Sequence, residues 1–218
     1  MERVVVARVD RSAPGRAVVR WASQEATLRG LPLRVIRHPL PDFLDEAQLV
    51  VADMRVLDAV AFSARPVVLI PEERAVRHPP HRVAEIVLGV DARDPAGGAL
   101  DFAFDTARLW GVRLRAVHAW WFPSCAAELP FGVPEEDRAT WEDHEVQLLA
   151  DALRRWREKY PEVRVLEDVR LFTPPHALLQ LSASAGLVVV GRGSRGEPGP
   201  TVRALLPESL CPVAVVPS

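Results

Sequence analysis

The chain has 218 residues, of which 49% are hydrophobic and 26% are charged, and its formal net charge at pH 7 is −2. These values are typical of a folded protein, and the small net charge excludes the strongly basic surface of proteins that bind nucleic acid or anionic membranes. The two cysteines are too few for a secreted disulfide scaffold, and no apolar run approaches the ~20 residues that span a bilayer. Because the first residues lack a basic and apolar leader, we expect a cytoplasmic protein.

The first part of the chain predicts a strand, a helix and three further strands. The first strand is the apolar run that ends at Val9-Asp10. Apolar residues then recur at helical spacing as far as Gly30, and glycine readily takes the left-handed conformation that ends a helix. Residues 33–36 predict another short strand, and residues 47–52 and 65–71 are valine-rich strands of the type found in parallel sheets with both faces covered.

The second part of the chain repeats this order from residue 85 onward. An apolar run ends at Val90-Asp91, a helix follows as far as Gly111, and residues 114–119 predict the next strand. The later apolar runs at residues 185–191 and 211–217 match the last two strands of the first part. This self-similarity predicts two copies of one βα unit.

The copies differ in the middle, where the second has a long insert over residues 120–184. Apolar residues at helical spacing predict a long helix over residues 135–160 of the insert. A strand over residues 163–172 and a short helix over residues 177–185 follow. The second copy therefore has about five strands, whereas the first has four and lacks one strand and one helix.

Strands and helices that alternate in this way predict a doubly wound α/β fold with right-handed crossovers. We expect two Rossmann-like open parallel-sheet domains in tandem, of which the first is truncated. The shortened domain covers residues 1–71, a linker with two prolines covers residues 72–84, and the full domain covers residues 85–218.

Short segments in a fixed order carry a family resemblance. In the second copy they are Ile86-Val87-Leu88-Gly89-Val90-Asp91, Val117-His118-Ala119-Trp120, Val188-Val189-Val190-Gly191 and Cys211-Pro212-Val213-Ala214-Val215-Val216. In the first copy they are Val9-Asp10, Arg20-Trp21-Ala22, Arg29-Gly30 and Pro66-Val67-Val68. In this order and spacing they resemble the universal stress protein family, most closely its tandem actinobacterial form.

The resemblance implies an adenine nucleotide alpha hydrolase-like fold and a regulatory protein rather than an enzyme. It also implies self-association through the terminal strand of each domain. The strand over residues 66–70 can therefore align antiparallel with the strand over residues 212–216, which would close two apolar edges within one chain. Weak ATP hydrolysis accompanies the family, but we can name no nucleophile–base pair or NTPase phosphate loop in this sequence.

The expected site lies beyond the carboxyl ends of the strands, where open α/β sheets bind ligands. The resemblance implies that Asp91 recognises adenine and that main-chain groups at Val117 hold the ring. A glycine loop would then wrap the ribose and phosphates of ATP or AMP, because glycines let backbone N–H groups approach oxygens closely. The residues in these last positions are Gly191, Gly193, Gly196 and Thr201.

The glycine loop departs from the family pattern Gly-x2-Gly-x9-Gly-Ser/Thr. Only two residues separate Gly196 from Gly199, and Pro200 stands where the pattern has a hydroxyl residue. Two interpretations therefore stay open for the second copy. One is an adenine nucleotide site, with Arg192 or Arg195 beside a phosphate, in which the base half is better kept than the phosphate half. The other is a tight turn without a ligand, in a scaffold that only pairs and interacts.

Several other residues have a structural interpretation beside the functional one. Asp91 can cap the following helix, His118 can be packed rather than touch a base, and the aromatic run at residues 120–122 can pack beneath the next loop instead of lining a cleft. In the first copy Asp10 is kept, but Asp53 would repel a phosphate, so we expect that copy to be structural. The six histidines have no metal-binding spacing, and we predict no metal.

Overall fold

The computed structural model describes residues 3–9, 15–37, 46–55, 63–71, 85–122, 134–193 and 198–217. Asp10, Arg195, Gly196 and the predicted linker over residues 72–84 lie outside these residues. No helix in the described ranges has the length and apolar character needed to cross a membrane.

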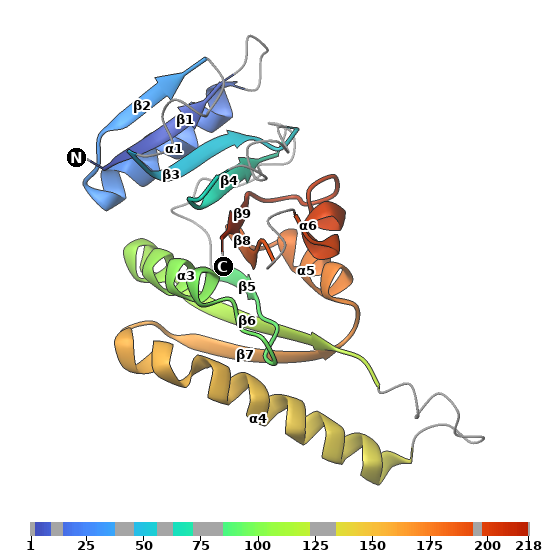
Figure 1. The fold of residues 1–218 in the computed structure, drawn as a ribbon. Helices are drawn as coiled ribbons and strands as arrows, with labels where there is room; N and C mark the ends of the chain where they lie inside the picture. The colour runs from blue at the N-terminus through green and yellow to red at the C-terminus, as the bar shows by residue number, and fades with distance from the viewer. Residues whose placement is uncertain are drawn as a thin grey trace.

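The strands belong to one sheet. They are β1 (Val4–Arg8), β2 (Leu33–Ile36), β3 (Ala47–Asp53), β4 (Val67–Ile70), β5 (Glu85–Gly89), β6 (Arg113–Trp120), β7 (Val165–Leu171), β8 (Leu187–Gly191) and β9 (Val213–Val216). Their order across the sheet is β2-β1-β3-β4-β9-β8-β5-β6-β7, which Figure 1 displays from top to bottom. Every neighbouring pair is parallel except β4 and β9.

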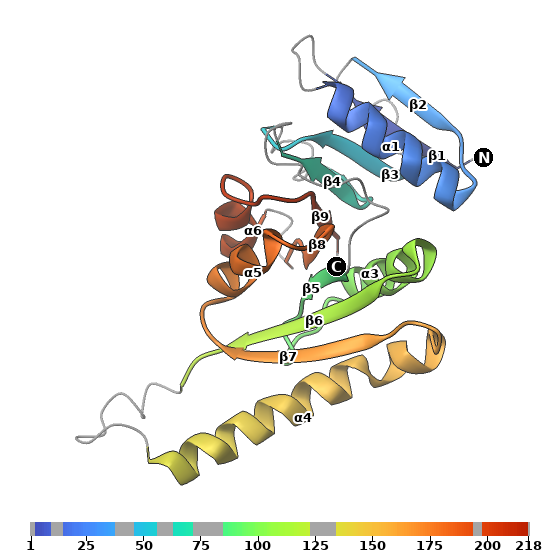
Figure 2. The ribbon, with the colours of Figure 1, turned by 180° about the vertical axis from the view of Figure 1, so that it is seen from behind.

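Helices cover both faces of the sheet. They are α1 (Gly15–Arg29), α3 (Gly97–Trp110), α4 (Glu135–Lys159), α5 (Pro174–Ser182) and α6 (Pro200–Leu205). On one face α1, α3 and α4 pack against every second strand residue, such as Val5 and Leu88. On the other face α5 and α6 pack against the alternate residues, such as Val87 and Val188 (Figure 2). The valine-rich strands are therefore buried on both sides, as parallel sheets require.

The predicted ends of α1 and α3 are confirmed. Gly30 and Gly111 follow α1 and α3 with φ of 64° and 65°, which an L side chain rarely adopts. Beyond Gly111, the backbone N–H of Val112 donates to the carbonyl of Ala107, which closes the end of α3. Leu28 is an exception to the helical spacing of buried apolar residues in α1, because its side chain is exposed.

An antiparallel seam joins the two parts of the sheet. Val67 pairs with Val215, and Leu69 pairs with Val213. This is the predicted alignment of the terminal strands, and it makes one continuous sheet of the two strand sets. We call the strands on the β4 side, with α1, the N-terminal half, and residues 85–217 the C-terminal half. Outward from the seam the order is β4-β3-β1-β2 on one side and β9-β8-β5-β6-β7 on the other.

A buried polar cluster joins the halves a second time, between α1 and α3. Arg29 donates to Glu25 Oε1 at 2.8 Å, to Asp105 Oδ2 at 3.0 Å and to Thr106 Oγ1 at 2.9 Å. Glu25, whose exposed fraction is 1%, also accepts a bond from Trp110 Nε1 at 2.9 Å. Because each buried charge in this cluster has partners, burial of these ions is compatible with a stable interface.

Candidate functional site

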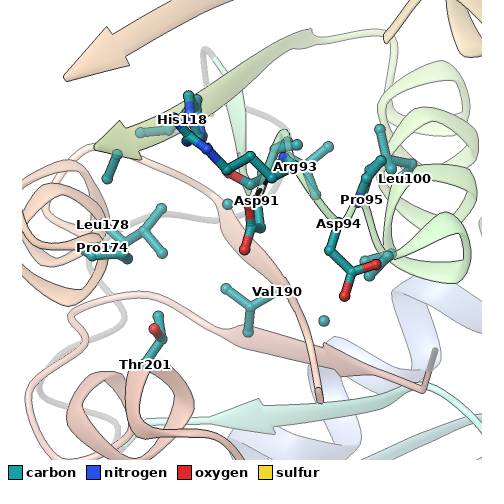
Figure 3. A pocket seen from close by; sticks show the side chains of 18 of the residues that line it. Asp91, Arg93, Asp94, Pro95, Leu100, His118, Pro174, Leu178, Val190 and Thr201 are labelled. Carbon is teal, nitrogen blue, oxygen red and sulfur yellow. Dashed lines mark hydrogen bonds between the residues drawn. The ribbon is translucent and has the colours of Figure 1, made fainter. Parts of the chain in front are cut away.

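A pocket with a volume of about 660 Å³ opens at the carboxyl ends of β5, β6 and β8 (Figure 3). β5 is flanked by β6 on one side and by β8 on the other, so the pocket lies where the connections diverge, as in other open α/β sheets. Five of the predicted site residues line it: Asp91, Val117, Gly191, Gly193 and Thr201. The sixth, Gly196, lies outside the described residues.

Asp91 belongs to the turn that follows β5, and its side chain is exposed. Its Oδ1 accepts a hydrogen bond from the backbone N–H of Arg93 at 3.0 Å, which fixes the turn. The prediction that Asp91 can cap the next helix is wrong, because the N-cap of α3 is Ala96 and no side chain caps it. Figure 3 shows the carboxylates of Asp91 and Asp94 directed into the pocket, with Val190 on its floor.

A buried acid–base pair supports this turn from below. His118 is 2% exposed, and its Nε2 lies 2.9 Å from Oε2 of Glu145 on α4. Arg93, in the same turn as Asp91, forms an ion pair with the other oxygen of Glu145. Burial raises the pKa of Glu145, but the hydrogen bonds and charges of Arg93 and His118 lower it further than burial raises it. The pKa of this carboxyl is therefore below its ordinary value, and the group is ionised at neutral pH.

The second nitrogen of His118 faces the main chain of the same turn. Its Nδ1 lies 3.1 Å from the carbonyl oxygen of Val90 and 3.4 Å from the backbone nitrogen of Ala92. If the ring is neutral and carries its proton on Nε2, Nδ1 accepts a hydrogen bond from the backbone N–H of Ala92. If both ring nitrogens are protonated, Nδ1 donates to the carbonyl oxygen of Val90. The structural interpretation of His118 fits best: it is a packed histidine that positions the turn.

Sequence reasoning missed Glu145, although a signal was present. Trp141, Glu145 and Leu149 follow one another at intervals of four along the predicted helix. An acid on the inner stripe of a helix is rarely buried without a partner, so it indicates a buried cation or histidine opposite. The missing information was which residue of the sheet lay across from it.

The glycine side of the pocket is closely packed. A Cβ atom on Gly191 would lie 2.8 Å from the Cβ of Ala96, so this glycine lets β8 approach the N-terminus of α3. Gly193 has a φ of +94°, the left-handed region that favours glycine. Arg192 does not line the pocket: its Nη1 donates to the carbonyl of Ser63 in the N-terminal half at 2.6 Å.

Of the three aromatic residues at the end of β6, two are packed and one is exposed. Trp120 packs edge-on against Phe122 at 5.1 Å between ring centroids, and Phe122 contacts Trp141 of α4 at 5.5 Å. Trp121, between them, lines the pocket and is 69% exposed. The packing interpretation therefore holds for Trp120 and Phe122, whereas Trp121 borders the open space.

The equivalent strand end in the N-terminal half has a different chemistry. Asp53, at the end of β3, accepts from the Nε of its neighbour Arg55 at 2.8 Å and is 7% exposed. This carboxylate stands where the C-terminal half has Gly191, and the sequence over residues 54–63 contains no glycine. Across the described ranges, no group of three or more histidine, cysteine or acidic side chains could hold a metal ion.

Comparisons with known proteins agree with this architecture. A universal stress protein of Mycobacterium tuberculosis is 37% identical over 158 residues, which cover 69% of this chain and 48% of that protein. The chain thus spans about half the length of the curated relatives it matches first.

Two solved structures of universal stress proteins are similar to this chain, and the first of them shares its fold. A universal stress protein from Archaeoglobus fulgidus superimposes with a TM-score of 0.57 and 14% identity over 99% of this chain and 88% of that chain. The universal stress protein from the same organism in complex with dAMP covers 61% of this chain and 96% of its own, with a TM-score of 0.41 and 21% identity.

The family model supplies the assignment. The model described as the universal stress protein family matches residues 82–217, which is more than half of the chain. This range contains β5 to β9 and every described residue that lines the pocket. The chain therefore belongs to the universal stress protein family.

Proposed function

We propose that this chain is a regulatory protein that binds an adenine compound in the pocket at the ends of β5, β6 and β8. The observation that carries the proposal is the convergence of Asp91, the main chain of β6 and the glycine turn after β8 on one cavity of about 660 Å³. This volume is in the range of small-molecule sites, roughly 300–1,000 Å³. The side-chain carboxylate of Asp91 at its wall is an acceptor suited to the exocyclic amine of adenine.

The main chain of β6 offers the second contact to the base. The carbonyl of Val117 accepts from the N–H of Val90 at 2.9 Å, and pairing with β5 ends at Val117. β6 nevertheless continues to Trp120. Because the backbone groups of every second strand residue face the same neighbouring strand, those of Ala119 face the space beyond the end of β5. Ala119 also lines the pocket. We therefore propose that the main chain of Ala119, together with that of Val117, holds the adenine ring.

The charges around the pocket favour a ligand with few phosphates. Its described charged lining residues are Asp91, Asp94 and Arg93, and Arg93 is already paired with Glu145. Two carboxylates repel a triphosphate more strongly than a monophosphate. The first turn of α3, which Ala96 leaves without a side-chain cap, presents backbone N–H groups for one anionic group at most. Adenosine and AMP should therefore bind more tightly than ATP.

The second candidate function is a scaffold without a ligand. Two observations favour it: the seam between β4 and β9 needs no ligand, and packing against Ala96 accounts for Gly191. In either case we propose that residues 1–71 are a shortened copy of the domain over residues 85–218, joined by residues 72–84. The matching strand order outward from the seam supports this duplication. Since β4 and β9 each have two neighbours, self-association of chains would have to use another surface.

Isothermal titration separates the two candidates. Wild-type protein is titrated with adenosine, AMP, dAMP and ATP, alongside Asp91→Asn and the control Asp143→Asn, which alters an exposed carboxylate on α4. We expect binding by wild type and control, with AMP ahead of ATP. Asp91→Asn should bind about ten- to a hundred-fold more weakly, because it loses a charged hydrogen bond. Wild-type titrations without heat for every compound would support the scaffold.

A further inference from the structure

Trp121 is the most exposed of the large hydrophobic side chains in the described part of the chain. Its exposed fraction of 69% exceeds the 51% of Leu210 and the 47% of Val35. Unlike those two residues, Trp121 lines the pocket at the ends of β5, β6 and β8. A wholly apolar ring face held in water beside a cavity gains free energy when a ligand covers it.

The residues on either side hold Trp121 at this position. Trp120 is 6% exposed and pairs in the sheet with Leu171 of β7, and Phe122 is wedged between Trp120 and Trp141. Strand residues alternate between faces, so His118, Trp120 and Phe122 lie on the α4 side. Val117 and Ala119 lie on the opposite, α5 side, and Trp121, directly after the end of β6, lines the pocket together with Leu178 of α5. The main chain of Trp121 is thus fixed before any ligand arrives.

The pocket offers a flat apolar ligand a second contact surface. Pro174 and Leu178 of α5 and Val190 of β8 all line it, and Figure 3 shows them around the same space as Asp91. A planar base can therefore contact aliphatic groups and an indole while its edge meets the carboxylate. Every nucleobase has a π face, and stacking on a tryptophan needs no hydrogen bond from the ring.

We propose that Trp121 is a specificity-determining residue of this pocket, an aromatic cap that stacks on the base of a bound purine. The inference rests on the proposed function, because it needs an adenine compound in the pocket. Beyond that function, the inference assigns to one side chain, Trp121, the preference of the pocket for a large planar base. It also explains why an indole stays exposed between two packed aromatic neighbours.

The test combines affinity with fluorescence. Trp121→Ala, Trp121→Phe and the control Leu210→Ala, which removes an exposed side chain outside the pocket, are titrated with AMP by calorimetry. Stacking contributes enough that Trp121→Ala should bind AMP about five- to a hundred-fold more weakly. Trp121→Phe should keep most of the affinity, and Leu210→Ala all of it. AMP should quench tryptophan emission in the wild type and much less in Trp121→Phe.

The outcomes are distinguishable from those of the proposed function. Loss of AMP affinity in Trp121→Ala with an unchanged thermal unfolding midpoint supports the cap. Equal AMP affinity in Trp121→Ala and wild type overturns the cap but leaves the proposed function intact. Quenching in Trp121→Phe equal to that in wild type also overturns it. If wild-type protein binds no adenine compound, the cap and the proposed function both fail.

Discussion

The Nε2 atom of His118 lies 2.9 Å from Oε2 of Glu145, and this bond connects β6, the strand next to the β7 edge of the sheet, to α4. Glu145 also holds Arg93, whose own backbone N–H holds the carboxylate of Asp91. The turn that carries Asp91 is therefore positioned by α4, a helix of the C-terminal half. The described N-terminal half has no strand beside β2 that would correspond to β7, which follows this helix.

Removal of the Glu145 carboxylate should destabilise the protein. Glu145→Ala leaves His118 buried without its partner, and we expect the free energy of unfolding to fall by about 2–4 kcal/mol. The loss can lie in the lower part of this range because Arg93, the other partner of Glu145, is half-exposed and can be solvated by water when the carboxylate is removed. Urea denaturation measures the change, with Glu142→Ala on the exposed face of α4 as the control. Equal unfolding curves for Glu145→Ala and Glu142→Ala would contradict the structural role of this carboxylate.

The same carboxylate should make stability depend on pH. The pKa of Glu145 in the folded chain is below its ordinary value of 4.5, so its stabilising contribution is complete above that value. It is lost as the pH falls through the lowered pKa. The stability advantage of wild type over Glu145→Gln should therefore be constant above about pH 5 and should shrink between about pH 5 and about pH 3. Urea denaturation midpoints of wild type and Glu145→Gln across this pH range test the prediction. A difference between the two midpoints that stays constant or grows as the pH falls would contradict it.

Arg29 should be far more important for stability than an ordinary surface arginine. Arg29→Ala leaves Glu25 buried without a cationic partner and breaks the link from α1 to α3, so we expect a loss of about 3 kcal/mol. Arg34→Ala is the matched control. It breaks the largely exposed ion pair with Glu46, which should change stability by less than about 1 kcal/mol. Similar losses in both variants would mean that the buried cluster does not join the halves.

A side chain at position 191 should disturb both packing and binding. In Gly191→Ala the new Cβ would meet Ala96 at 2.8 Å, and overpacking of this kind costs about 1–3 kcal/mol. Because both residues line the pocket, AMP binding should weaken as well. Gly199→Ala is the control, since its Cβ would lie 3.7 Å from the nearest neighbour, the carbonyl oxygen of Arg192. Thermal melts and AMP titrations of the two variants should differ; matching results would contradict the close approach.

The thiol of Cys211 should be unreactive in the folded protein. Burial raises its pKa to about 12, despite a smaller opposing effect of Ser209, so very little thiolate is present near neutral pH. A Cys125→Ser variant leaves Cys211 as the one thiol of the chain. We expect iodoacetamide to alkylate it at least roughly a hundred-fold more slowly in buffer than in urea, measured by mass spectrometry. Comparable rates in both conditions would indicate an accessible thiol.

Most of the strands were predictable because burial on both faces leaves a direct mark on the sequence, although the edge strands β2 and β7 are less buried. All nine predicted strands are present among the described residues, from the run that ends at Val9 to the run at residues 211–217. The long helix α4 was predicted to within one residue. The helix α6 was missed, because its six residues are too few to display a helical period; Pro200 at its start was the remaining signal.

The site was predictable only as far as topology fixes it. Asp91 and Gly191 end strands, and carboxyl ends of parallel strands meet at one edge, so their common pocket followed from the sequence. The partner of Glu145 did not follow, because it depends on how α4 lies across the sheet. Nor did the direction of Arg192, which bonds to Ser63 from the other half instead of facing the pocket. Long side chains can reach several partners, and which of these partners lie nearby is determined only by the tertiary structure.

The antiparallel seam also constrains how the chain can be made. During synthesis, β4 leaves the ribosome well before residues 213–216 exist to cover its open edge, and all four of its residues are apolar. Until then that edge is a template for wrong pairing with other nascent chains. The N-terminal half should consequently depend on chaperones or rapid translation, and its yield when expressed alone should be poor unless the C-terminal half is supplied alongside it.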